Sequence, residues 1–242
     1  MLITYLRLSA RGDALFSQDD FNDFVVDSGV IGLFDEPVKL KSGRMSCWYV
    51  NWRTVMEDAY LANCLIGQVH EFVWERLPNA QAFYGVPEGA TKLALLAQME
   101  WARSRGDFVA GSYSLSMGRG KPKEHGDLKD RFFLGVPKGN TVVLEDVTTT
   151  GGSLIESVKS LELVKAKVIA AVGLTDREEV RDDGRTVAQK LSEMGIMYYS
   201  MSRATELLPI VFARKKGLVP QRIRSEVEGY FDKYGAKKLV LK

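Results

Sequence analysis

One stretch decides the fold: Thr141-Val142-Val143-Leu144-Glu145-Asp146-Val147-Thr148-Thr149-Thr150-Gly151-Gly152-Ser153. It reads as a buried strand ending in two adjacent acids, then a loop of hydroxyls and glycines, then a helix over 154–163. Ligands of an open α/β sheet bind at the carboxyl ends of the strands, where the two acids fall. The glycines let backbone N–H groups turn around an anion, and the helix directs its positive N-terminus at the same place. The simplest ligand that satisfies both halves is a phosphate in the loop with a sugar diol on the carboxylates. The alternative, a plain strand-to-helix turn capped by Ser153, explains Ser153 and one glycine but not the acids and threonines.

Strands and helices alternate through the middle of the chain. We expect strands at 82–86, 108–113, 141–147, 168–174 and 196–200. We expect helices at 54–77, 89–103, 154–163 and 186–194. This alternation is typical of βαβ units and a parallel sheet. Thr54 and Glu57 have capping-box spacing at the start of the first helix, which Pro78 ends.

The two ends of the chain show a different pattern. A helix is expected over 19–29, with short antiparallel strands over 39–51. Two further helices are expected near 205–214 and 220–234. In the last of these, apolar residues share one face, which should pack on another element; they are Ile223, Val227, Phe231 and Tyr234.

Composition excludes several classes of protein. The chain has 242 residues, enough for one large domain or a domain with appendages, and a net charge of +2, too small to indicate nucleic acid. Cys47 and Cys64 form no metal-spaced set and no disulfide framework, so a reducing compartment is expected. No stretch is apolar enough for a signal peptide or a membrane span. We therefore expect a soluble, cytoplasmic protein.

A second informative stretch is Arg119-Gly120-Lys121-Pro122-Lys123-Glu124-His125-Gly126. Its glycines and proline exclude regular structure, and on its own it could be a solvated basic loop. It also follows a strand candidate of the βα series, so its base should lie near the ligand edge of the sheet. Beside a phosphate-binding motif, the segment reads as a lid that brings positive charge to a polyanion and stays mobile until that polyanion binds.

These stretches resemble motifs of the orotate phosphoribosyltransferases, a branch of the type I phosphoribosyltransferases. The acids and the following loop resemble the motif that binds 5-phosphoribosyl 1-pyrophosphate (PRPP). Arg119, Lys123, His125 and Gly126 match the lid pattern Arg-Lys-x-x-Lys-x-His-Gly. The segment over 40–51 resembles the hood motif Leu-Lys-Ser-Gly-Arg-x-Ser-x-x-Tyr/Phe, which is the most specific signal for the orotate enzymes.

Two positions depart from the family pattern. Gly120 stands where the family usually has a second lysine, and Lys121 is its candidate substitute. Glu88, in the segment 84–89 that resembles the pyrophosphate loop, stands where some members have lysine. Because a carboxylate does not bind pyrophosphate, we expect the backbone N–H groups of this loop to bind it.

The resemblance extends from about 29 to 234 and implies an α/β fold: a parallel-sheet type I phosphoribosyltransferase core with an N-terminal hood and C-terminal helices. It implies a single domain over 1–242, with an N-terminal helix and hood over 1–52, the core over 53–203 and a helical extension over 204–242. The implied reaction joins orotate to PRPP and releases pyrophosphate and orotidine 5′-monophosphate. Two alternatives stay open: transfer to another base, and a non-catalytic PRPP-binding regulatory protein.

The resemblance also assigns roles to residues. It implies that PRPP is bound by Glu145, Asp146, Val147, Thr148, Thr149, Thr150, Gly151, Gly152, Ser153, Lys41, Arg119, Lys123 and His125. It implies that orotate is bound by Lys41, Tyr49, Val50, Thr149 and Arg177. The catalytic residues would be Lys123, His125, Arg119 and Asp146. Mg²⁺ is expected on PRPP and water rather than on protein ligands, and a homodimer that shares the lid across its interface is expected, with no nucleic acid or membrane partner.

Overall fold

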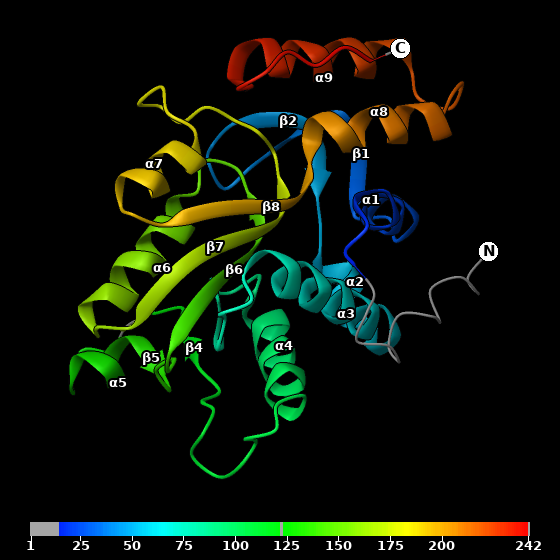
Figure 1. Ribbon diagram of the computed structural model, residues 1–242. Helices are drawn as coiled ribbons and strands as arrows, with labels where there is room; N and C mark the ends of the chain where they lie inside the picture. The colour runs from blue at the N-terminus through cyan, green and yellow to red at the C-terminus, as the bar shows by residue number, and fades with distance from the viewer. Residues whose placement is uncertain (1–14, 122, 242) are drawn as a thin grey trace.

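The computed structural model describes residues 15–121 and 123–241 and centres on a parallel sheet of four strands in the order β3-β6-β7-β8 (Figure 1). The strands are β3 (Ala82–Gly85), β6 (Asn140–Thr148), β7 (Lys167–Asp176) and β8 (Met197–Arg203). All neighbouring pairs run parallel, so their carboxyl ends meet at one edge. The predicted alternation of strands and helices is confirmed for these four strands.

Helices cover both faces of this sheet (Figure 1). Alternate residues of β6 enter different cores: Val142 and Leu144 pack with α3 (Ala59–Arg76) and α4 (Thr91–Arg103). Val143 packs on the other face, with α6 (Gly152–Leu163) and α7 (Val187–Glu193). A strand buried on both faces explains why its sequence is a continuous apolar run.

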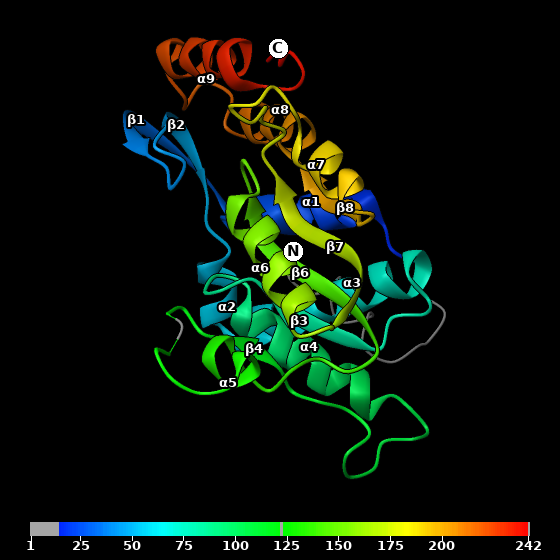
Figure 2. The same ribbon diagram turned by 90° about the vertical axis from the view of Figure 1, so that its left-hand side faces the viewer.

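The N-terminal and C-terminal elements lie together beside the sheet. The helix α1 (Gln18–Asp27) precedes an antiparallel hairpin of β1 (Ile31–Lys39) and β2 (Met45–Val50), which forms the hood. The C-terminal helices are α8 (Ala204–Arg214) and α9 (Gln221–Tyr234). Figure 2 shows α9 across the hairpin, and the stacked rings of Trp48 and Phe231, 6.0 Å apart, join the two. The predicted apolar face of this last helix is confirmed for Ile223, Val227 and Phe231, which are buried.

The long helix predicted over 54–77 is divided. A short α2 (Arg53–Glu57) ends before Asp58, whose side chain accepts a 2.8 Å hydrogen bond from the N–H of Leu61 and so caps α3. The hydroxyl of Thr54 instead donates to the carbonyl of Asn51. The capping-box prediction was wrong because aspartate is an equally good N-cap and lies one turn further along.

The strand predicted over 108–113 is absent, and this segment forms turns. Phe108 and Val109 are exposed, and Gly111 has a φ of +86°. An apolar run becomes a strand only where a neighbouring strand and a core receive it. The strand here comes later: β4 (Met117–Gly118) pairs with β5 (Phe133–Leu134), and α5 (Leu128–Phe132) lies between them.

Within the described ranges, no helix combines the length and apolar character that a bilayer crossing requires.

Candidate functional site

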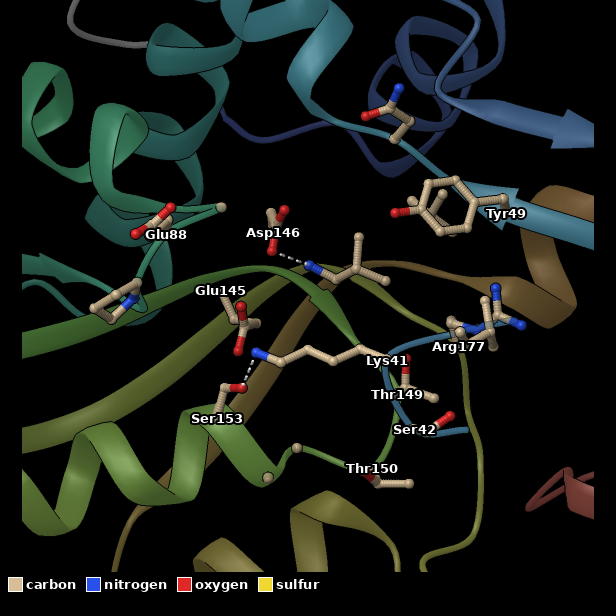
Figure 3. A pocket seen from close by; sticks show the side chains of 18 of the residues that line it. Lys41, Ser42, Tyr49, Glu88, Glu145, Asp146, Thr149, Thr150, Ser153 and Arg177 are labelled. Carbon is tan, nitrogen blue, oxygen red and sulfur yellow. Dashed lines mark hydrogen bonds between the residues drawn. The ribbon is translucent and has the colours of Figure 1, made fainter. Parts of the chain in front are cut away.

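A cavity of about 460 Å³ lies between the hood and the carboxyl edge of the sheet (Figure 3). The hood turn over 40–42 forms one wall, and the end of β6 with the loop after it forms the other. The turn that precedes α4, over 87–89, closes a third side. The site therefore lies where a parallel sheet places its ligands.

The phosphate loop, residues 148–153, turns sharply into α6. Gly151 has a φ of +68°, and a Cβ at this position would lie 1.8 Å from Val187 Cγ2. Glycine is therefore required here both by backbone conformation and by space. The helix begins at Gly152, so Gly151 and not Ser153 is its N-cap. The first N–H groups of α6 have no partner within the helix and border the cavity, as an anion site requires.

Two adjacent acids follow the apolar part of β6. Glu145 is buried, and burial raises its pKa well above the usual value, with the charge of Asp146 as the next cause. Asp146 Oδ1 accepts a hydrogen bond of 2.9 Å from the N–H of Val147. A Cβ on Gly89 would lie 2.2 Å from Asp146 Oδ2, so this glycine lets the turn before α4 approach the acid pair. The pair lines the cavity, as a diol-binding pair should.

Lys41 reaches from the hood turn across the cavity, where its Nζ donates a 2.8 Å hydrogen bond to Ser153 Oγ (Figure 3). Tyr49 and Val50 line the hood side, as predicted. The hood and the phosphate loop thus face one another over a single space.

Arg177 lines the cavity but is 1% exposed. Its Nε donates to Glu179 Oε1 at 2.7 Å, and its other nitrogens donate to the carbonyl of Trp48 and to Ser46 Oγ. The guanidinium also lies 3.7 Å from the centre of the Trp48 ring. The hydroxyl of Tyr230 is a further hydrogen-bond partner of the guanidinium, which has five N–H groups in all.

The lid residues Arg119, Lys123 and His125 do not line this cavity. They belong to the hairpin of β4 and β5, in which the N–H of Arg119 donates to Phe132 and that of Lys123 to Arg131. The base of the hairpin rests on the turn before α4: a Cβ on Gly120 would lie 2.4 Å from Glu88 Oε1. The two departures from the family pattern are therefore in contact with each other.

Of the predicted residues outside the lid, the structure brings all but Thr148 to the cavity wall. Thr148 is fully buried, so its side chain faces the interior. Sequence analysis missed Asn51, Arg53 and Glu156, which also line the cavity. Asn51 directly follows the predicted Tyr49-Val50 pair, so its position in the sequence could have indicated that it lines the cavity. No sequence pattern indicates Arg53 or Glu156.

The sheet order, the acid pair and the phosphate loop together define a type I phosphoribosyltransferase. Solved structures share the fold: an orotate phosphoribosyltransferase from Francisella tularensis has a TM-score of 0.62 at 19% identity and covers 90% of this chain and 100% of its own. The UMP synthase of Leishmania donovani has a TM-score of 0.65 at 18% identity over 89% of this chain and 42% of its own.

Sequence relatives identify the branch. An orotate phosphoribosyltransferase from Bradyrhizobium diazoefficiens is 34% identical over 178 residues, which covers 71% of this chain and 87% of that protein. An orotate phosphoribosyltransferase from Aquifex aeolicus is 33% identical over 178 residues, which covers 72% of this chain and 88% of that protein. A comparison with family models gives no match. The chain belongs to the orotate phosphoribosyltransferase family, which confirms the fold class and family indicated by the motifs.

Proposed function

We propose that the protein transfers the phosphoribosyl group of PRPP to orotate, giving orotidine 5′-monophosphate and pyrophosphate, as a step of pyrimidine biosynthesis. Membership of the family supports this reaction. The observation that carries it is the cavity itself, in which the acid pair and the phosphate loop face a hood turn across the Lys41–Ser153 hydrogen bond. One side has the groups for a ribose 5-phosphate, and the other has an aromatic wall for a flat base.

In this proposal the residues of the cavity act mainly by positioning the substrates and by electrostatic stabilisation. The N–H groups at the start of α6, with the hydroxyls of Thr149, Thr150 and Ser153, bind the 5′-phosphate. Glu145 and Asp146 hold the ribose hydroxyls and stabilise positive charge that develops on the sugar as the bond to pyrophosphate breaks. Tyr49 and Val50 cover the base and exclude water.

Recognition of orotate falls to Arg177. Its contacts with Glu179 and Trp48 hold the guanidinium in one orientation, in which it donates to the substrate carboxylate. A rigid, preoriented arginine favours a base with a carboxylate over one without it.

Departure of pyrophosphate needs positive charge, and among the described residues the lid cations do not line the cavity of their own chain. The described wall carries Glu88, Glu145, Asp146 and Glu156 against Lys41, Arg53 and Arg177, and Arg177 is already paired with Glu179. We propose a homodimer in which the lid of one subunit, with Arg119, Lys123 and His125, closes over the cavity of the other. The lid then places positive charge beside the negative charge that develops on the leaving pyrophosphate.

We also propose that Mg²⁺ enters with PRPP. Among residues 15–121 and 123–241, no three His, Cys, Asp or Glu side chains gather as metal ligands. Mg²⁺ keeps several waters and takes one or two carboxylates at most, so Asp146 fits a contact through water. When bound, the ion neutralises charge on the pyrophosphate. The free thiols of Cys47 and Cys64 fit a reducing cytoplasm.

A base screen tests the function. Purified protein with PRPP and Mg²⁺ should consume orotate and release pyrophosphate, and it should turn over uracil very poorly. Arg177→Ala should raise the KM for orotate more than that for PRPP, and Asp146→Asn is the inactive control. Comparable turnover of uracil would remove the role given to Arg177, and PRPP binding without turnover of any base would favour a regulatory protein.

A further inference from the structure

The segment over 177–187, which leads from the end of β7 into α7, packs along the phosphate loop. At its start, the N–H of Arg177 donates to the carbonyl of Thr148 at 2.9 Å. At its end, Val187 occupies the space beside Gly151, where a Cβ would lie 1.8 Å from Val187 Cγ2. The loop that faces the cavity is therefore supported from a second loop on its other side.

Arg181 makes a third contact between these two. Its Nη1 donates a hydrogen bond to the carbonyl of Thr150, in the middle of the phosphate loop. Among residues 15–121 and 123–241, no other hydrogen bond to this carbonyl is found. Thr150 lines the cavity, whereas Arg181 does not. The guanidinium therefore contacts the loop from outside the ligand space.

This contact fixes the orientation of one peptide group. The peptide between Thr150 and Gly151 is planar and trans, so its carbonyl and its N–H point in opposite directions. Because the carbonyl points at Arg181, the N–H of Gly151 points away from Arg181. A glycine adopts either sign of φ at little cost, so this peptide group is free to turn over unless something holds it. After such a turn, a carbonyl oxygen and not an N–H would face the phosphate.

Arg181 is itself held by a closed turn. Its N–H donates to the carbonyl of Arg185 at 2.8 Å, and its carbonyl accepts the N–H of Gly184 at 2.9 Å. Its Nε lies 3.6 Å from Asp183 Oδ1, and the side chain is 22% exposed. A guanidinium that is placed by its own backbone and by a carboxylate is a fixed donor for the loop.

We propose that Arg181 is a positioning residue for the 5′-phosphate: its bond to the Thr150 carbonyl keeps the N–H of Gly151 directed at the phosphate. Arg181 touches no substrate and acts only through the phosphate loop. The inference deepens the proposed function and rests on it, because it takes a phosphoribosyl compound as the ligand of this loop.

The proposal predicts a selective loss of phosphate binding. Arg181→Met removes the donor and keeps a long side chain, so the affinities for PRPP and for ribose 5-phosphate should fall about tenfold. The KM for PRPP should rise by a similar factor. The kcat should change less than about twofold, because the 5′-phosphate is bound equally before and during the reaction. The KM for orotate should also change less than about twofold, because the base binds elsewhere in the cavity.

Calorimetric titration with ribose 5-phosphate and with PRPP measures the affinities, and circular dichroism without ligand checks that each variant is folded. Arg185→Met is the matched control. It removes the same charge from the same turn, but Arg185 Nη1 donates to Glu193 Oε2 at 2.7 Å, so its loss should change either affinity less than about twofold. If Arg181→Met does not fold, Arg181→Gln takes its place with the same expectation, since its amide ends where the arginine Nε lies and does not reach the carbonyl.

Three results would overturn the proposal: wild-type affinity for ribose 5-phosphate in the Arg181 variant, equal losses in the Arg181 and Arg185 variants, or equal rises in the KM values for orotate and PRPP. The second would show an effect of charge alone, and the third a general disturbance of the fold. The outcome is separable from that of the proposed function. A selective loss of ribose 5-phosphate binding in a protein that does not consume orotate would contradict the reaction and leave the positioning role standing. Normal orotate turnover with unchanged phosphate binding in the Arg181 variant would do the opposite.

Discussion

Glu179 offers the sharpest test of how the hood is held on the core. Its carboxylate is fully buried and accepts hydrogen bonds from Arg44 Nη1 at 2.7 Å, from Arg177 Nε at 2.7 Å and from the Tyr230 hydroxyl at 2.8 Å. These partners belong to the hood, to the end of β7 and to α9. Glu179→Ala would leave two buried guanidinium groups without this carboxylate.

The size of the loss follows from burial. Breaking a buried ion pair by removing one partner costs about 3–5 kcal/mol, because the remaining charge is desolvated and unpaired. Arg44 keeps the carbonyl of Val180 and the exposed Asp182, whereas Arg177 keeps only neutral acceptors. We therefore expect a loss of about 4 kcal/mol in the free energy of unfolding, which for a chain of this size lowers the Tm by about 8–16 °C.

Chemical denaturation and calorimetry measure this change, and the KM for orotate should rise because Arg177 loses its anchor. Glu193→Ala is the matched control. Its carboxylate pairs with Arg185 and Lys190 but is 45% exposed, so its loss should cost at most about 1 kcal/mol. If the Glu179 and Glu193 variants differ by less than about 1 kcal/mol, the buried network does not fix the hood.

Three further predictions concern the lid, the assembly and pH. Lys123→Ala should lower kcat about a hundredfold, with orotidine 5′-monophosphate binding nearly intact because the product lacks pyrophosphate; near wild-type turnover would reduce the lid to a connector. Mixing Lys123→Ala with Asp146→Asn should restore partial activity through hybrid dimers, whereas a fully active monomer in light scattering would contradict sharing of the lid. Burial raises the pKa of Asp176 from 3.8 to about 6, so the folded state holds its proton more tightly and stability falls as pH rises through this window. Asp176→Asn should therefore raise the Tm more at pH 8 than at pH 4, and equal shifts at both would contradict the assignment.

Sequence patterns predicted the parts of the fold that are locally encoded. The apolar run of β6, with the alternation of strands and helices around it, was enough to predict the parallel sheet. A strand that is buried on both faces has a continuous apolar sequence, which is easily recognised. The break at Asp58 and the turns at Phe108 depend on choices between near-equal local conformations, which tertiary contacts decide.

The site shows the same division. Residues within one motif, such as Asp146 and Ser153, were found because a single loop carries them. Thr148 was assigned to the ligand because its neighbours are hydroxyl residues, but strand geometry turns its side chain inward. The approach of the Thr148 and Tyr198 hydroxyls to Gly173 was not visible in sequence, because the three residues lie on separate strands.

The hood joins the two ends of the polypeptide. Cys47 Sγ on β2 lies 2.8 Å from Glu226 Oε2 on α9, and the two residues are 179 positions apart in the chain. During translation the strands of the hood leave the ribosome before the core strands, whereas the helix that packs on Trp48 is made after the core. The α/β core can assemble while the base-binding wall is still uncovered. Competence to bind a base is therefore acquired after the core has formed.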